Sequence, residues 1–283
     1  MKNKQIVKKF IWCTVTAVIL RCFQLLVLTM ENTGFFIREY SVLGKLSSFL
    51  ILILCVFPFI LSLNGKRQPS HPPAYHKPLC FAAYIVAAAV LIEVLTNGFA
   101  GTVPLFLVAL YRLSGILAAA VFVAYGCLGF VKKLNFLRGA LILTVIFMFM
   151  RLVISFSSYS SLAGITDSYF DIFMLCSYLC FFLFFAKTVC FVSIKKSCFN
   201  ILPSAFLSIF FTAVNTIPRL LMYMFKKSAL VHPTPTYLFT NIAIGVFIGL
   251  FAFYLFSKSN FRVKRHTTVV LPENHSDISN DRS

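Results

Sequence analysis

The chain contains eight apolar segments, each close to the length that crosses a lipid bilayer. The hydrocarbon core of a bilayer is about 30 Å thick, and a helix needs about 20 apolar residues to span it. Hydrophobic residues are 59% of the chain and charged residues 12%, which is far more apolar than a soluble domain. The sequence therefore predicts an all-α, polytopic transmembrane helix bundle with eight spans. These spans are residues 10–30, 46–63, 79–97, 104–130, 140–156, 169–194, 201–225 and 237–256.

Lysine and arginine residues gather in alternate connections between the spans, and these connections lie on one side of the membrane if there are eight spans. Clusters precede the first span, lie in the second, fourth and sixth connections, and follow the last span. Because cytoplasmic loops carry the excess of basic residues, eight spans place both termini in the cytoplasm. The net charge of +18 then reflects topology, and nucleic acid is not predicted as a partner.

The predicted organisation is a transmembrane domain over residues 1–256 and a disordered cytoplasmic tail over residues 257–283. The tail is polar and too short to bury a core of its own. The predicted location is a plasma membrane with the chain as a multi-pass protein. Short connections, and predicted external loops without cysteine, favour a bacterial inner membrane.

A weak internal similarity relates the two halves of the chain. An ungapped shift of 130 residues matches Arg21 with Arg151 and Gly115 with Gly245, and it aligns the basic second and sixth connections. The match is compatible with a tandem 4+4 helix repeat whose halves run parallel. Apolar segments also agree by chance, so an unduplicated bundle stays the alternative.

Five charged residues lie deep inside the predicted spans, where lipid cannot solvate them: Arg21, Glu93, Arg112, Arg151 and Arg219. Asp171 and Lys187 lie near the ends of the sixth span. An arginine at a helix centre costs roughly 2.5 to 3.5 kcal/mol on insertion scales, so these side chains should face protein, water or one another. Glu93 and Arg112 belong to consecutive antiparallel spans at similar predicted heights. We therefore expect an ion pair between them, which either fixes two helices together or acts as a gating or coupling pair.

One deep carboxylate cannot neutralise four buried arginines. The surplus positive charge needs an anion, backbone carbonyls or water. Arg21, Arg151 and Arg219 are therefore the predicted binding residues for an anionic group such as a carboxylate or phosphate. Gln24 stands three residues after Arg21 and shares its helix face.

The seventh span contains the sequence Asn215-Thr216-Ile217-Pro218-Arg219. Pro218 has no N–H to donate to the carbonyl of Val214, so a helix kink is expected there. Asn215 and Arg219 lie four residues apart on one face, beside the kink. Broken helices with nearby polar side chains form substrate sites in many transporters, so Asn215 joins the predicted ligand-binding residues. The alternative is an ordinary kink without a ligand.

Gly245 and Gly249 form a small-x-x-x-small pair in the last span, with Asn241 one turn earlier. Such a pair lets another helix approach closely. The pair predicts helix packing inside the bundle, or a contact with a second copy or a membrane partner.

Catalytic and metal-binding signatures are sparse in this sequence. No histidine lies inside a predicted span, and H-E-x-x-H, P-loop and G-x-S-x-G motifs are absent. Neither a metal site nor a cofactor is predicted, and an enzyme is disfavoured, although a lipid-modifying enzyme stays a third reading. The leading hypothesis is a small-molecule or ion permease with an arginine-lined cavity for an anionic group. The alternative is a membrane sensor or an accessory or assembly subunit without transport activity.

Overall fold

The computed structural model describes residues 2–28, 37–63, 76–97, 103–128, 135–162, 168–194, 201–225 and 235–265. Over these ranges the fold is all-helical, with eight α-helices, a short 3-10 turn at Arg38–Tyr40 and no strand. The helices are α1 (Lys2–Val27), α2 (Ser41–Leu63), α3 (Lys77–Thr96), α4 (Leu105–Leu128), α5 (Asn135–Leu162), α6 (Ser168–Ile194), α7 (Ile201–Met224) and α8 (Pro235–Arg265).

Each of the eight helices overlaps one of the eight predicted spans, although several ends differ. Seven of them are long and apolar enough to cross a membrane, by length and composition, over the residues described. In α6 the described apolar stretch is shorter, Phe173–Val189, so an eighth span stays a prediction. The helix α8 continues to Arg265, so the first residues of the predicted tail are helical, while 266–283 lie outside the described residues.

Local sequence explains where several helices begin and how their hydroxyl groups are satisfied. Pro78, Pro104 and Pro235 stand at or beside the first residues of α3, α4 and α8, where a missing N–H costs no hydrogen bond. Inside the helices, hydroxyl groups such as Thr96 and Thr188 donate to the carbonyl four residues earlier, at 2.6 and 2.8 Å. These bonds keep polar atoms paired in an apolar setting.

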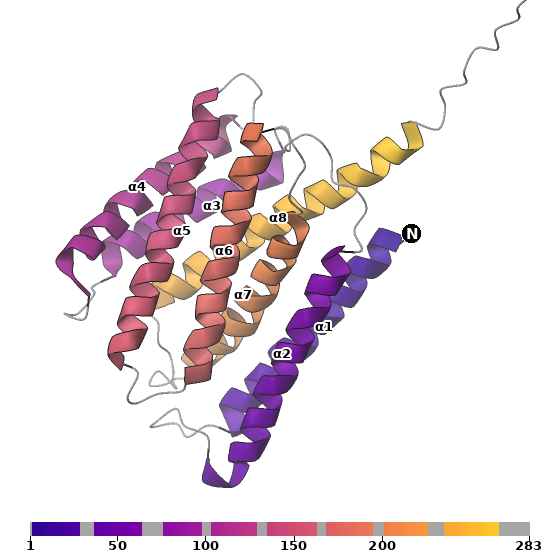
Figure 1. Cartoon of the computed structure of the whole chain (residues 1–283), viewed down its shortest axis with the longest axis vertical. Helices are drawn as coiled ribbons and strands as arrows, with labels where there is room; N and C mark the ends of the chain where they lie inside the picture. Colours follow the sequence, from indigo (N-terminus) through magenta and orange to yellow (C-terminus); the bar gives the residue numbers. More distant parts are fainter. Residues whose placement is uncertain are drawn as a thin grey trace, which may run out of the picture.

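The helices α3 to α8 form a closed ring, because each packs on the next and α8 packs back on α3. The remaining two, α1 and α2, form an antiparallel hairpin that packs on α7, outside the ring (Figure 1). The N-terminus and the far end of α8 lie at the same end of the bundle (Figure 1). The cytoplasmic location of both termini and the 4+4 repeat stay predictions.

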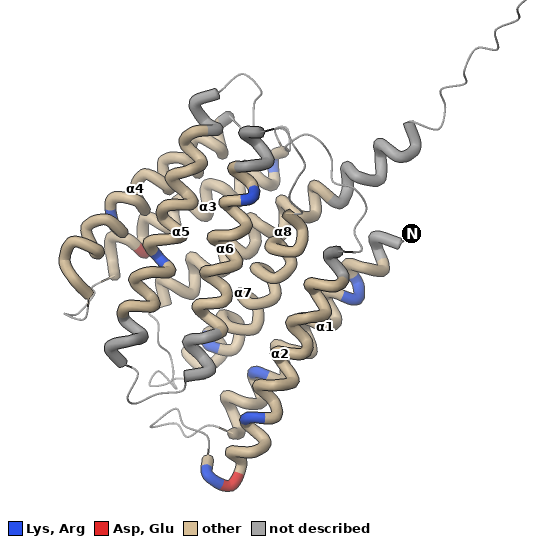
Figure 2. Tube along the Cα trace, viewed as in Figure 1, with Lys and Arg blue, Asp and Glu red and all other residues tan. Residues whose placement is uncertain are grey.

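The exterior of the bundle differs from that of a soluble protein. Many large apolar residues are exposed on it; Leu105 is 85% exposed and Phe253 63%. Charged residues are few along the described parts of the helices (Figure 2), and Arg21, Arg151 and Arg219 are at most 2% exposed. An apolar exterior around buried charges is the arrangement expected of a multi-pass membrane protein.

The two glycines of α8 are used within the bundle. A Cβ atom placed on Gly245 would lie 3.0 Å from Cγ2 of Thr212, and one on Gly249 would lie 3.8 Å from Cδ1 of Ile209. Both neighbours belong to α7, so the small residues let α7 and α8 pack closely. Contact of a second copy or a membrane partner with Gly245 and Gly249 stays a proposal. It would use a helix face that α7 already covers.

Candidate functional site: an ion pair enclosed by the helix ring

The ring encloses a two-bonded ion pair between Glu93 of α3 and Arg151 of α5. The Nε atom of Arg151 donates to Oε1 of Glu93 at 2.8 Å, and Nη2 donates to Oε2 at 2.8 Å. Both side chains are 0% exposed. A planar guanidinium matches both carboxylate oxygens in this geometry, which makes it the strong form of a charged hydrogen bond.

The predicted ion pair between Glu93 and Arg112 is therefore wrong. Arg112 is exposed, and its Nη2 atom lies 3.4 Å from the backbone carbonyl of Asn97 at the end of α3. Successive helix residues point about 100° apart, so the buried neighbour Tyr111 faces the ring interior and Arg112 faces outward. The predicted gating or coupling pair required a contact between Arg112 and the carboxylate of Glu93, and that carboxylate pairs with Arg151 instead.

The true partner was missed because the predicted start of the fifth span was too late. The helix α5 begins at Asn135 rather than at residue 140. Glu93 and Arg151 each lie sixteen residues after the first residue of their helix, Lys77 or Asn135, a rise of about 24 Å. The two side chains are thus at equal height in two helices of the ring.

The other donors of Arg151 are also engaged by the protein. Its Nη1 atom donates to Oδ1 of Asn241 at 2.7 Å, and Nη2 lies 3.3 Å from the carbonyl of Tyr237, both on α8. The guanidinium carbon lies 4.6 Å from the ring centroid of Tyr178 and 5.0 Å from that of Tyr237. Hydrogen bonds and two aromatic faces thus solvate this cation in place of water.

The hydroxyl group of Tyr111 on α4 donates to Oε1 of Glu93. With this bond the cluster draws on five of the six ring helices, and its members are α3 Glu93, α4 Tyr111, α5 Arg151, α6 Tyr178 and α8 Tyr237 and Asn241. A single polar cluster therefore connects nearly the whole ring.

Arg21 belongs to a second polar cluster, between α1 and α2. It donates to Oε1 of Gln24, and Nε2 of Gln24 donates to Oγ of Ser48 at 2.6 Å and to the carbonyl of Gly44 at 3.0 Å. The guanidinium carbon of Arg21 also lies 5.2 Å from the ring centroid of Phe173 on α6. The shared helix face of Arg21 and Gln24 predicted from the sequence is thus used for a direct hydrogen bond.

The helix α7 contains Pro218 and unsatisfied polar groups beside it. The amide nitrogen Nδ2 of Asn215 and the hydroxyl oxygen of Thr216 are buried, and neither has a hydrogen-bond partner in the described part of the chain. Pro218 also leaves the Val214 carbonyl without its usual donor. Buried polar groups without partners are costly, so the part of α7 around Pro218 is where the described residues leave hydrogen bonds unmade.

Arg219 lies one turn beyond Asn215 and is 2% exposed. Its Nη1 atom lies 3.5 Å from the sulfur of Met174 on α6. The three arginines predicted to bind an anion thus all contact one short stretch of α6, through the pairs Arg21 with Phe173, Arg219 with Met174 and Arg151 with Tyr178. This helix, which carried none of the predicted site residues, is the wall that they share.

Sequence reasoning missed the tyrosines and assigned Asn241 only to packing. Tyr111 and Tyr178 could have been found from their phenol groups within apolar spans, because a buried hydroxyl needs a partner. Among the described residues, no three His, Cys, Asp or Glu side chains gather into a metal site.

Chemically, the site pairs a carboxylate with a guanidinium, and polar groups without partners among the described residues lie beside Pro218. Comparison of the chain with protein-family models, curated proteins and solved structures finds no match.

Proposed function

We propose that this protein is a permease for a small anion. Its proposed location is a plasma membrane, specifically a bacterial inner membrane. The observation that carries the proposal is the stretch of α7 beside Pro218, where Asn215 and Thr216 have buried polar groups without partners in the described part of the chain, one turn from Arg219. Donors beside a cation suit a carboxylate or phosphate group, which accepts several hydrogen bonds. Half-broken helices supply such sites in known transporter architectures.

The Glu93 and Arg151 pair supplies the coupling element in this proposal. Met174 and Tyr178, the α6 contacts of Arg219 and Arg151, are one helical turn apart, about 6 Å along the axis. A proton on Glu93 weakens the two-bonded pair and frees guanidinium donors of Arg151 toward the same region. The anion would then bind between Arg219 and Arg151 when Glu93 is neutral, which couples anion and proton movement. Arg21, which contacts the adjacent residue Phe173 of α6, would add positive potential to this region.

The test is anion flux into proteoliposomes. Acetate, lactate, glutamate and inorganic phosphate are supplied outside, and uptake is compared with empty liposomes. The purified protein is expected to accelerate at least one of them, and Arg219→Leu is expected to abolish that flux while leaving the protein inserted. Arg112→Leu is the matched control, because it removes an exposed arginine outside the cluster and should preserve flux.

Two results would count against this proposal. Flux equal to that of empty liposomes for every anion in the panel would contradict the permease. Unchanged flux in Arg219→Leu would contradict the binding site beside Pro218, even if transport occurs.

A second candidate is an accessory or assembly subunit without transport activity. The specific observation in its favour is that Arg151 has protein partners for Nε, Nη1 and Nη2, as a purely structural fastening would. This candidate predicts that a stable partner copurifies with the chain from native membranes. It also predicts that a double replacement, Glu93→Leu with Arg151→Leu, leaves the protein's cellular role intact. Under the permease proposal, the same replacement would abolish the coupling of anion movement to proton movement.

A further inference from the structure

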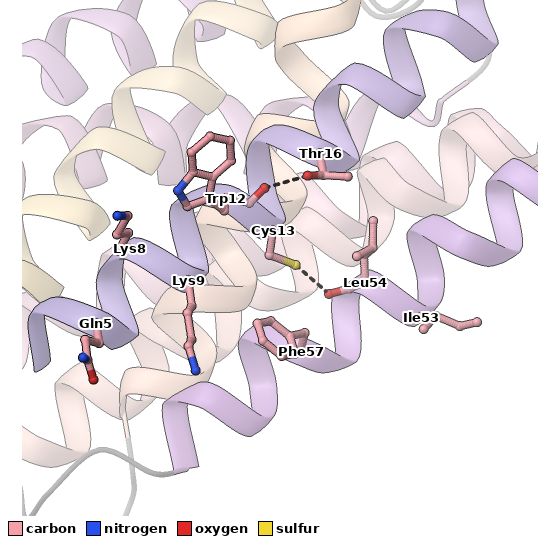
Figure 3. Close-up of a pocket in the computed structure, with 9 residues that line it drawn as sticks. All are labelled: Gln5, Lys8, Lys9, Trp12, Cys13, Thr16, Ile53, Leu54 and Phe57. Carbon is pink, nitrogen blue, oxygen red and sulfur yellow. Dashed lines mark hydrogen bonds between the residues drawn. The ribbon is translucent and has the colours of Figure 1, made fainter. Parts of the chain in front are cut away.

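A groove of about 830 Å³ lies between α1 and α2, on the outside of the bundle and away from the ion pair. Its walls include the apolar side chains of Ile53, Leu54 and Phe57 from α2 and Trp12 from α1. Figure 3 draws these residues on the two neighbouring helices. A volume of this size accommodates a substantial part of a lipid molecule, since pockets of about 300 to 1,000 Å³ hold whole small ligands.

The chemistry of the groove changes along its length. Lys8, Lys9 and Gln5 line it near the start of the first membrane-crossing stretch, Gln5–Val27. Both lysines are exposed, and Figure 3 shows Lys8 beside Trp12 and Lys9 on the flank that faces Phe57. The two lysines therefore lie at the end of the groove nearest the start of α1, and mainly apolar side chains line the rest of it.

A proline and a thiol fix the shape of the groove wall. Pro58 lies inside α2 and has no N–H for the carbonyl of Leu54. The thiol of Cys13 on α1 lies 3.4 Å from that carbonyl oxygen and donates to it. A cross-helix bond thus replaces the missing bond within α2 and joins the two walls.

We propose that this groove binds an anionic phospholipid, with its phosphate headgroup at Lys8 and Lys9 and its acyl chain along Ile53, Leu54 and Phe57. Three observations support this occupant. The charge of the lysines complements a phosphate, the adjoining wall is apolar, and Trp12 has the amphipathic ring that favours the headgroup level. A soluble anion would contact only the lysines, whereas a phospholipid would contact both the lysines and the apolar wall of the groove.

Trp12 makes the proposal directly measurable, because it is the chain's single tryptophan. The full-length protein is reconstituted into bilayers that contain brominated phosphatidylglycerol or brominated phosphatidylcholine at equal mole fraction. Bromine quenches tryptophan fluorescence only at short range, so quenching reports lipid in this groove. The anionic lipid is expected to quench Trp12 more strongly, and Lys9→Gln should lower its preference about fivefold, the effect of one basic residue near an anionic surface.

Lys77→Gln is the matched control. Lys77 is an exposed lysine at the start of α3, on the predicted cytoplasmic side but outside the groove, so its removal should leave the preference unchanged. Lys8→Gln with Lys9→Gln should abolish the preference. Equal quenching by the two lipids in the unmodified protein would overturn the proposal, as would an equal loss in Lys77→Gln and Lys9→Gln.

Two measurements on the unmodified protein keep the test decisive if the lysine variants insert poorly. Raising salt to about 0.5 M shortens the Debye length and should reduce the preference, because the lysines are exposed. Millimolar inorganic phosphate should not displace the lipid. A preference that is independent of salt, or that is lost to inorganic phosphate, contradicts a phospholipid site.

Discussion

Removing one partner of the Glu93 and Arg151 pair has a different free-energy cost from replacing both partners. Taking two charges out of water costs several kcal/mol each, and their mutual attraction offsets this only when the geometry and remaining hydrogen bonds are good. Here the carboxylate accepts from Arg151 twice and from Tyr111, and the guanidinium is otherwise held by Asn241 and Tyr237. Loss of one partner leaves an uncompensated charge inside the ring.

We predict that Glu93→Gln destabilises the protein by about 3 to 5 kcal/mol, the cost of leaving one buried charge unpaired. Arg151→Met should cost a similar amount. The double variant should be more stable than the sum of the single effects implies, because neither charge is then left alone. Denaturant unfolding in mild detergent measures all three. Additive effects would show that the two side chains are energetically independent despite their contact.

The helices α2 and α7 each contain a proline, and the surroundings of the two prolines differ. In α2 the carbonyl left by Pro58 accepts a bond from Cys13 of the neighbouring helix. In α7 Pro218 lies beside buried groups that stay unsatisfied among the described residues. The first proline therefore shapes a helix contact, and the second leaves a region of unmet hydrogen bonding. Only the second has the properties of a polar binding site.

Close packing at Gly115 joins three helices near the ion pair. A Cβ atom there would collide with Val94 of α3 and would lie 3.0 Å from the ring of Phe147 on α5. Both neighbours are at most 1% exposed, so they have little room to move. Val94 follows Glu93 directly, so a displacement of α3 at this point also moves the carboxylate.

We predict that Gly115→Ala destabilises the protein by about 1 to 3 kcal/mol through overpacking. Gly139→Ala is the control, because no atom lies within 4 Å of a Cβ placed there. It should be neutral or stabilising by up to about 1 kcal/mol, since alanine is the better helix former. Thermal unfolding in detergent gives both values. Equal midpoints for the two variants would contradict the close contact of α3, α4 and α5 at Gly115.

The closed ring requires that α3 and α8 lie side by side, although they are far apart in the sequence. The hydroxyl of Thr240 on α8 lies 3.2 Å from the carbonyl of Ala89 on α3. We predict that Ala89→Cys with Thr240→Cys is joined efficiently by a short thiol-reactive cross-linker in native membranes. The native cysteines are first replaced by alanine. Mobility on denaturing gels measures the product.

The control for this cross-link pairs Ala89→Cys with Ile19→Cys. Ile19 is on α1 and is 63% exposed, away from the ring contact. The control pair should stay unlinked under the same conditions. Equal linking of both pairs would mean that the reagent reports collision rather than ring closure, and absence of the first product would contradict the closed ring.

The all-helical fold was predictable because apolar length depends only on local sequence. The burial of Arg21, Glu93, Arg151 and Arg219 was also predictable, since their charge excludes contact with lipid. The partner of Glu93 was not, because heights taken from hydropathy shift with the chosen helix start, as happened at Asn135. Ring closure between α3 and α8 has no local signature, and no periodicity of either helix specifies it.

The position of the α1 and α2 hairpin constrains how the chain can be assembled. Its packing surface, α7, is synthesised long after it, so in an insertion that follows synthesis the hairpin precedes its neighbour. Arg21 contacts Phe173 of the later helix α6, but its bond to Gln24, and the bonds of Gln24 to Gly44 and Ser48, lie within the first two helices. The hairpin thus supplies hydrogen bonds to the arginine before α6 is made, whereas the ion-pair partner of Glu93 belongs to a helix that is made later.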